Sequence, residues 1–300
     1  MTGQRVGFVG LGNMGGRMAR CVVDAGREVL GYDVRPEVVS AAGARPVATV
    51  AEVVSGSDVV LLSLPDSKVV ERVVYGDDGL LATVRSGQTV VDLSTASPDS
   101  TRRIHGDLAA KDVAFLDAGI SGGAAAAEKG ALTLMVGGST AALESVREVL
   151  DLFSANIFHC GESGAGHVTK LLNNFLNAVS LAATAEVMVA GKKAGLDLKV
   201  LLDVLNVSSG VNFATLNRFP KIITGDYLKG GLSNTLMLKD ITLYTELVGK
   251  LGVASLNSAG PVASFGLARA LGYADEISNT VVDAIGDISG GVRLYQSDRK

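Results

Sequence analysis

The first residues whose types and spacing could do chemistry are three glycines near the start of the chain. Gly10, Gly12 and Gly15 have the G-x-G-x-x-G spacing, between an apolar run at 5–10 and a helical pattern that begins at Met14. In this context Gly10 allows a tight turn, Gly12 lets the backbone approach a pyrophosphate, and Gly15 lets the helix pack closely on the strand. The helix N-terminus then offers free N–H groups and a partial positive charge to phosphates. The pattern predicts a dinucleotide site.

An acidic residue, Asp33, extends this motif. It closes the next apolar stretch about 20 residues further on, where a carboxylate can accept hydrogen bonds from a ribose diol and repel a 2′-phosphate. Arg35 is a counter-argument, because a nearby arginine can pair with that phosphate. We therefore expect NAD to be the preferred cofactor, with NADP possible. The alternative is a glycine-rich turn in some other α/β protein.

A polar pair follows the segment Gly161-Glu-Ser-Gly-Ala-Gly166. Lys170 and Asn174 lie four residues apart, so they share one face of the predicted helix. The helix is otherwise very apolar, and burying an unpaired lysine or asparagine there would be costly. Both side chains are therefore candidates for a functional site, although a lysine can also extend its amine to solvent.

Two further segments carry polar groups in suggestive places. The turn Ser121-Gly122-Gly123 directly follows an apolar strand, and its hydroxyl and bare backbone N–H groups could hold a small carboxylate. A simple strand-to-loop turn is the alternative.

The adjacent pair Lys239-Asp240 lies in a helical pattern and is typical of a solvated helix face.

The elements that must position these residues change in character along the chain. Up to residue 159 short apolar runs alternate with helical patterns, which predicts a Rossmann-type, doubly wound, mostly parallel sheet with helices on both faces. Residues that bind ligands should lie at the carboxyl ends of its strands. We expect a dinucleotide-binding domain at 1–163, a long interdomain helix at 164–194, and an all-α substrate and oligomerisation domain at 195–300. The expected strands lie at 5–10, 28–32, 58–64, 88–93, 113–117, 132–136 and 156–159.

The composition argues against several function classes. The chain has 300 residues, 47% of them hydrophobic, and a net charge of −4, which gives no electrostatic footprint for nucleic acid or an anionic membrane. No run of about 20 uncharged apolar residues predicts a membrane span. Glycines interrupt the first apolar stretch, unlike a signal peptide.

Cys21 and Cys160 lack metal spacing and are expected to be buried thiols in a reducing compartment, the cytoplasm. His105, His159 and His167 show no metal spacing either, so no metal is expected.

These motifs together resemble the β-hydroxyacid dehydrogenase family over essentially the whole chain. The resemblance rests on Gly10–Gly15, Asp117–Gly123, the run from Gly161 through Lys170 to Asn174, and Lys239-Asp240. It implies an oxidoreductase that transfers hydride between NAD(P) and a small 3-hydroxy acid of the 3-hydroxyisobutyrate, glycerate/tartronate semialdehyde or threonate type. It also implies that Lys170 is the general acid/base.

The resemblance implies roles for further residues. Substrate binding falls to Ser121, Gly122, Gly123 and Asn174. Cofactor binding falls to Gly10, Leu11, Gly12, Asn13, Met14, Gly15, Asp33, Arg35, Leu64, Pro65, Thr95 and Lys239. Gly119 stands where the family usually has a proline, which implies a looser loop before the substrate turn. A homodimer or homotetramer formed through the helical half is also implied.

Related classes with the same architecture are the alternatives. Imine reductases generally lack a lysine at position 170, so its presence favours hydroxy acids. A non-catalytic NAD(P)-binding protein on this fold would have lost that lysine. 6-Phosphogluconate dehydrogenases are related but considerably longer. The sequence leaves open which hydroxy acid is used and in which direction.

Overall fold

The computed structural model describes residues 3–228 and 230–295. The chain divides into two compact units, Met1–Lys170 and Leu171–Lys300. The first unit contains the whole sheet, and the second is helical. In the described residues no helix is long and apolar enough to cross a bilayer.

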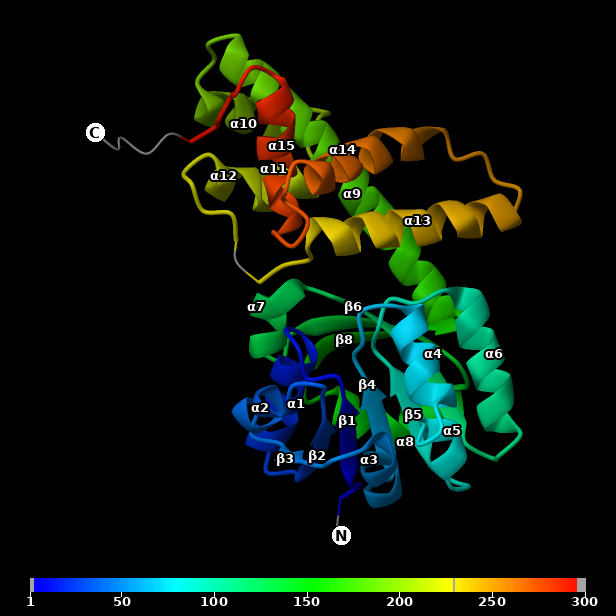
Figure 1. The fold of residues 1–300 in the computed structure, drawn as a ribbon. Coiled ribbons are helices and arrows are strands. Elements are labelled where there is room, and N and C mark those ends of the chain that lie inside the picture. Colours follow the sequence, from blue (N-terminus) through cyan, green and yellow to red (C-terminus); the bar gives the residue numbers. More distant parts are fainter. Residues whose placement is uncertain (1–2, 229, 296–300) are drawn as a thin grey trace. The chain divides into compact units, whose positions relative to one another are not determined.

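The first unit is built on one eight-stranded sheet (Figure 1) with the order β3-β2-β1-β4-β5-β6-β7-β8. Neighbouring strands are parallel except β6 and β7, which pair antiparallel with Asp117 opposite Gly137. The strands are β1 Val6–Val9, β2 Val29–Tyr32, β3 Arg45–Pro46, β4 Val59–Leu62, β5 Thr89–Asp92, β6 Ala114–Ser121, β7 Leu132–Gly137 and β8 Ser154–Gly161.

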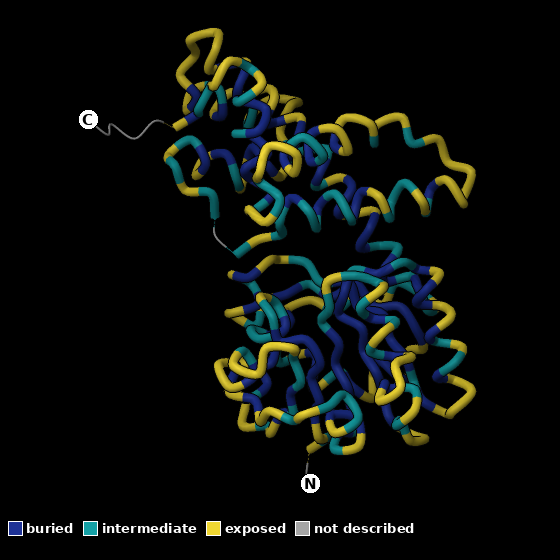
Figure 2. Tube along the Cα trace, viewed as in Figure 1, coloured by how far each residue is buried: buried dark blue, intermediate teal, exposed yellow. Residues whose placement is uncertain are grey.

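Helices cover both faces of this sheet, and each face has its own apolar core. Successive strand residues alternate between the two cores: Leu61 packs in the one that contains α1, α2 and α8, and Val60 in the one that contains α3, α4 and α6. The central strands β1, β4 and β5 are consequently buried along their whole length (Figure 2), as parallel strands usually are, whereas the edge strands β3 and β8 are largely exposed. The helices are α1 Gly15–Asp24, α2 Pro36–Ala41, α3 Val50–Gly56, α4 Ser67–Tyr75, α5 Leu80–Thr83, α6 Pro98–Ala109, α7 Gly123–Glu128 and α8 Thr140–Leu150.

The predicted fold class is confirmed, with differences in detail. All seven expected strands are present, and the short elements β3, α5 and α7 are additional. Strand β6 continues to Ser121, four residues beyond the expected end, because its second half pairs with β7.

Helix α9, Ala165–Lys193, begins in the first unit and continues into the second. The remaining helices of the second unit pack around a core that includes Phe219, Met237 and Phe265. They are α10 Leu198–Asn206, α11 Phe213–Asn217, α12 Phe219–Ile222, α13 Asn234–Lys250, α14 Ala259–Ala270 and α15 Val281–Ile288, with 3-10 turns at Leu256–Ser258 and Ser278–Thr280.

Candidate active site

The loop Gly10–Gly15 joins β1 to α1, and its three motif glycines differ in their surroundings. Gly10 has φ +86°, and a Cβ there would collide with the carbonyl oxygen of Ser63. A Cβ on Gly15 would collide with the carbonyl of Gly10, so the helix could not approach the strand. Around Gly12, by contrast, a Cβ would meet only the Arg35 guanidinium, at 3.7 Å. The backbone at Gly12 is therefore the part of the loop open to a ligand.

Asp33, immediately after β2, braces this loop. Its Oδ2 accepts the Leu11 N–H at 2.9 Å, and its Oδ1 accepts the Arg35 N–H at 3.0 Å. The Arg35 Nε also lies 3.7 Å from Oδ1. A carboxylate offers about four lone-pair sites, so acceptor capacity for a ribose hydroxyl remains.

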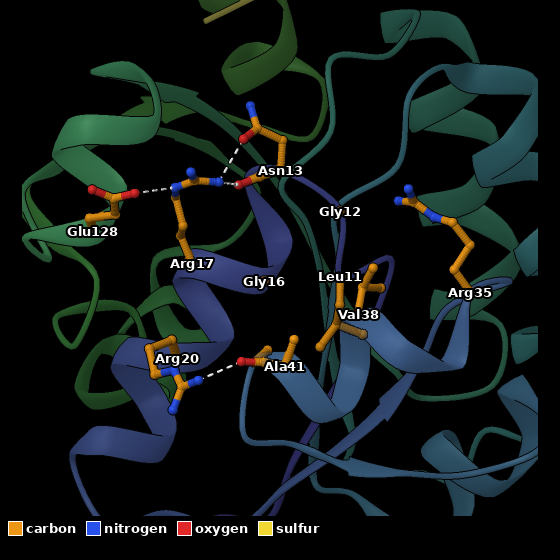
Figure 3. Close-up of a pocket in the computed structure, with 11 residues that line it drawn as sticks. Leu11, Gly12, Asn13, Gly16, Arg17, Arg20, Arg35, Val38, Ala41 and Glu128 are labelled. Carbon is orange, nitrogen blue, oxygen red and sulfur yellow. Dashed lines mark hydrogen bonds and ion pairs between the residues drawn. The ribbon is translucent and has the colours of Figure 1, made fainter. Parts of the chain in front are cut away.

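A pocket of about 420 Å³ lies beside the loop and contains three arginines (Figure 3). Arg17 donates to Asn13 and pairs with Glu128 at 2.8 Å, and Arg20 donates to a backbone carbonyl of α2. The side chain of Arg35 is 59% exposed. Open backbone, a braced carboxylate and a positively charged wall fit the phosphates and ribose of a dinucleotide.

The loops after β4 and β5 adjoin the same edge of the sheet. Leu64 follows β4, and its Cδ2 lies 2.9 Å from the position that a Cβ on Gly10 would take. The Leu64 N–H donates to Ser94 Oγ at 2.9 Å, which joins this loop to the one that carries Thr95. Pro65 is the next residue of the first loop. The structure thus brings Leu64 to the glycine loop, as a shared cofactor site requires.

The expected substrate turn lies at the end of β6. Gly122 and Gly123 have φ values of +124° and +68°, a region that favours glycine. A Cβ on Gly122 would lie 2.6 Å from Ala126 Cβ, whereas nothing lies within 4 Å of one on Gly123. The turn after Ser121 is therefore closely packed at Gly122 and open at Gly123.

Lys170 is held against β6, and only 8% of it is exposed. A Cβ on Gly119 would lie 2.5 Å from Lys170 Cβ and 3.0 Å from its Cγ. The expectation of a looser loop at Gly119 is wrong, because this residue lies inside β6 and pairs with Met135. The glycine is there because the strand and the first turns of α9 touch.

Asp117 holds the start of α9, a role that the sequence alone did not predict. Its side chain is fully buried, and its two oxygens accept the N–H groups of Gly164 at 2.7 Å and His167 at 2.8 Å. A carboxylate at a helix N-terminus satisfies otherwise unpaired donors and complements the helix dipole. Gly166 packs on this strand so closely that a Cβ would collide with the Asp117 carbonyl. The only signal in the sequence was an acid at the end of the expected apolar strand at 113–117.

In the second unit Asn174 is oriented by Asp240 of α13. Asn174 Nδ2 donates to Asp240 Oδ2 at 2.5 Å, and Lys239 Nζ pairs with Asp240 Oδ1 at 3.0 Å. Asp240 is 1% exposed, so the expectation of a solvated Lys-Asp pair is wrong for this residue. Because the Asn174 amide donates to a carboxylate, its carbonyl oxygen faces other donors, including Asn173 Nδ2 at 3.2 Å.

The cysteines and histidines lie in different surroundings. Cys21 and Cys160 are free thiols, and both are partly exposed, so the expectation that they are buried is wrong. His167 is fully buried, and its Nδ1 lies 2.7 Å from Thr101 Oγ1. Over residues 3–228 and 230–295 no group of three His, Cys, Asp or Glu side chains could hold a metal ion.

Two family models cover most of the chain. The NAD binding domain of 6-phosphogluconate dehydrogenase matches residues 5–161, and the NAD-binding domain of NADP-dependent 3-hydroxyisobutyrate dehydrogenase matches residues 164–284. An NAD-dependent L-serine dehydrogenase of Pseudomonas aeruginosa is 41% identical over 81% of this chain and 85% of its own. A 2-(hydroxymethyl)glutarate dehydrogenase of Eubacterium barkeri is 34% identical over 95% of this chain and 96% of its own.

Solved structures agree with these matches. A 3-hydroxyisobutyrate dehydrogenase of Mycobacterium tuberculosis, solved with L-serine, superposes with a TM-score of 0.83 at 31% identity, covering 94% of this chain and 99% of its own. An imine reductase from Pseudomonas sp. is 18% identical with a TM-score of 0.59, a likeness of fold alone. The chain belongs to the β-hydroxyacid dehydrogenase family. It is an NAD(P)-dependent oxidoreductase that acts on the CH–OH group of hydroxy acids.

Proposed function

We propose that the substrate is a small acid of the form HOCH2–CH(X)–COO⁻, interconverted with its aldehyde. Serine, 3-hydroxyisobutyrate and 2-(hydroxymethyl)glutarate, named by the similar enzymes, share this frame and differ in X. Glycerate has the same frame. The observation that carries the proposal is Lys170, buried against β6 and followed one helical turn later by Asn174.

The proposed chemistry divides between cofactor and protein. The nicotinamide cofactor, when bound, supplies the acceptor or donor of hydride at the hydroxyl-bearing carbon. Lys170 Nζ takes the hydroxyl proton in oxidation and returns it in reduction. The Asn174 amide, held by Asp240, orients the substrate oxygen. Ser121, Gly122 and Gly123 hold the substrate carboxylate with a hydroxyl and backbone N–H groups.

We further propose that NAD is preferred over NADP. The position of Asp33 at the glycine loop supports this preference, because its charge would repel a 2′-phosphate. Arg35 supports the opposite choice, but its charge is partly balanced by Asp33 itself. The values of kcat/KM for the two cofactors test the proposal, and a clear NADP preference would mean that Arg35 outweighs Asp33.

The assembly and domain roles are also proposals. We propose a homodimer or homotetramer formed through the helical half, because α10 and α11 expose Val200, Val204 and Leu216. Residues 1–163 would bind the dinucleotide, 164–194 would form the connecting helix, and 195–300 would contribute to substrate binding and assembly. Sedimentation velocity of the purified chain tests the assembly, and a monomer at micromolar concentration would contradict it.

The test of the function is a turnover assay with purified protein. Reduced cofactor is followed with L-serine, 3-hydroxyisobutyrate, 2-(hydroxymethyl)glutarate and glycerate, each with NAD and with NADP. Neutral alcohols of matching length serve as controls. Turnover of at least one acid, and none of the alcohols, is expected. Equal turnover of neutral alcohols would show that the enzyme does not recognise the substrate carboxylate. No turnover of any acid with either cofactor would contradict the proposed HOCH2–CH(X)–COO⁻ frame.

A further inference from the structure

Arg218, between α11 and α12 in the second unit, is a half-buried cation that donates to neutral amides. Its Nη1 donates to Asn279 Oδ1 at 2.7 Å, and its Nη2 donates to Asn177 Oδ1 at 3.0 Å. The guanidinium also lies 5.8 Å from the centre of the Phe213 ring. A guanidinium has five N–H donors, so the two amide oxygens use only part of its capacity. Within the described part of the chain no carboxylate pairs with it.

Burial makes this arrangement costly. Burial disfavours the charged guanidinium and lowers the pKa of Arg218 from 12.5 to about 10. Arg293, in the same unit, is the contrast: the carboxylates of Asp287 and Asp283 pair with it and hold its pKa above the usual value. A partly buried cation is normally paired, and neutral amides alone do not balance its charge. The arrangement at Arg218 fits a site completed by an anionic ligand.

The position of Arg218 relates it to the proposed substrate site. Its acceptor Asn177 lies three residues after Asn174 on α9, so the two asparagines share a helix face about 4.5 Å apart along the axis. Asp240 fixes the Asn174 amide, and Arg218 contacts the Asn177 amide. A group bound to Arg218 would thus lie about one helical turn beyond the oxygen that Asn174 orients.

We infer that Arg218 binds a second carboxylate of the substrate, carried by the substituent X, and so selects dicarboxylic hydroxy acids. This inference rests on the proposed function and deepens it. A guanidinium fork donates two parallel hydrogen bonds to a carboxylate, and one cation balances its single negative charge. An X that carries an ammonium group, as in serine, would be repelled by Arg218.

The first test compares substrates on the wild-type enzyme. 2-(Hydroxymethyl)glutarate and 3-hydroxyisobutyrate share the reacting frame, and only the former has a second carboxylate. We expect kcat/KM to be about 10- to 100-fold higher for the dicarboxylate, the range of a hydrogen bond to a charged group, with L-serine the poorest. Glutarate should also inhibit more strongly than butyrate. Equal or reversed rankings would overturn the inference and leave the proposed function intact, whereas inactivity on all acids would overturn both.

The second test uses variants. Arg218→Met should lose at least tenfold more kcat/KM on the dicarboxylate than on 3-hydroxyisobutyrate, mainly through KM. Arg218→Lys keeps the charge without the fork and should fall between the two. Arg269→Met removes an exposed arginine of α14 and should leave the substrate ratio unchanged. Equal losses on both substrates, together with a lower melting temperature, would show that Arg218 only ties helices together. If Arg218→Met does not fold, Arg218→Lys and the wild-type competition between glutarate and butyrate distinguish these two outcomes.

Discussion

At the scale of single residues, one buried carboxylate determines where the proposed general acid/base stands. Asp117 accepts two backbone N–H groups at the start of α9, and Lys170 lies on the next turns of that helix. The helix start can therefore not shift along β6 without breaking two charge-assisted hydrogen bonds. The geometry of the site depends on a residue with no chemical role of its own.

Replacing Asp117 by asparagine tests this anchoring. One oxygen becomes an NH2 group that faces an N–H donor, so one hydrogen bond is lost and a buried donor is left unpaired. We expect the free energy of unfolding to fall by about 1.5–3 kcal/mol, measured by urea denaturation. Asp151→Asn, at an exposed position after α8, is the control and should stay within about 0.5 kcal/mol of wild type. An Asp117→Asn protein as stable as the control would refute the anchoring role.

At the scale of elements, strand β6 and helix α9 are in direct contact at Gly119, where the sequence predicted a loop. Gly119→Ala would place a Cβ 2.5 Å from Lys170 Cβ, a distance that forces strand and helix apart. We expect both the melting temperature and kcat to fall, because overpacking typically costs about 1–3 kcal/mol and displaces the lysine.

Gly106→Ala is the matched control for this glycine. Gly106 lies in α6 without positive φ, and a Cβ there would meet nothing within 4 Å. Alanine in a helix is favoured over glycine by up to about 1 kcal/mol, so this variant should be slightly stabilised. Unchanged stability and turnover in Gly119→Ala would mean that β6 and α9 can separate freely.

A second pair of elements, β1 and β4, predicts a pH dependence. Arg5, just before β1, pairs with Asp58, just before β4, at 2.7 Å. The side-chain hydrogen bond from Arg5 is the main reason why the pKa of Asp58 falls from 3.8 to about 2. A depressed acid pKa stabilises the fold above the unfolded value, so this contribution is present above pH 3.8 and is lost as the pH falls toward 2.

Asp58→Asn should therefore destabilise the protein at neutral pH. The pair is solvent-exposed, with 43% of the Asp58 side chain accessible, so we expect a loss of about 1 kcal/mol or less. The difference between variant and wild type in urea denaturation should shrink between about pH 4 and about pH 2. A difference that grows as the pH falls would contradict this explanation.

The sequence predicted the elements better than the contacts between them. Apolar runs and helical periodicity located the strands of the sheet and the long helix α9, because burial imposes those patterns. Strand β3 and helices α5 and α7 were missed, since each has six residues or fewer and shows little periodicity. The glycines at positions 10 and 15 were interpretable because each meets a local steric constraint, whereas Gly12 leaves the loop open to a ligand.

At the scale of the whole molecule, pairings between distant residues were beyond the sequence. Asp117 meets Gly164, and Asn174 meets Asp240, across 47 and 66 residues of chain. No local pattern reports such partners, so Asp240 was expected to be solvated, and Asp117 and Arg218 were not singled out. The family models, which cover residues 5–161 and 164–284, support the class of reaction that the sequence predicted but do not report these contacts.

The central claim is that Lys170 carries the proton in an NAD(P)-dependent oxidation of a hydroxy acid. The most direct measurement is kcat of Lys170→Met on the best substrate, with cofactor affinity measured by calorimetry. Methionine keeps the apolar stem beside Gly119 and removes the amine, so kcat should fall about 10²- to 10⁴-fold with cofactor affinity little changed. Lys192→Met, exposed near the end of the same helix, should retain wild-type turnover. Near wild-type turnover in Lys170→Met would contradict the claim.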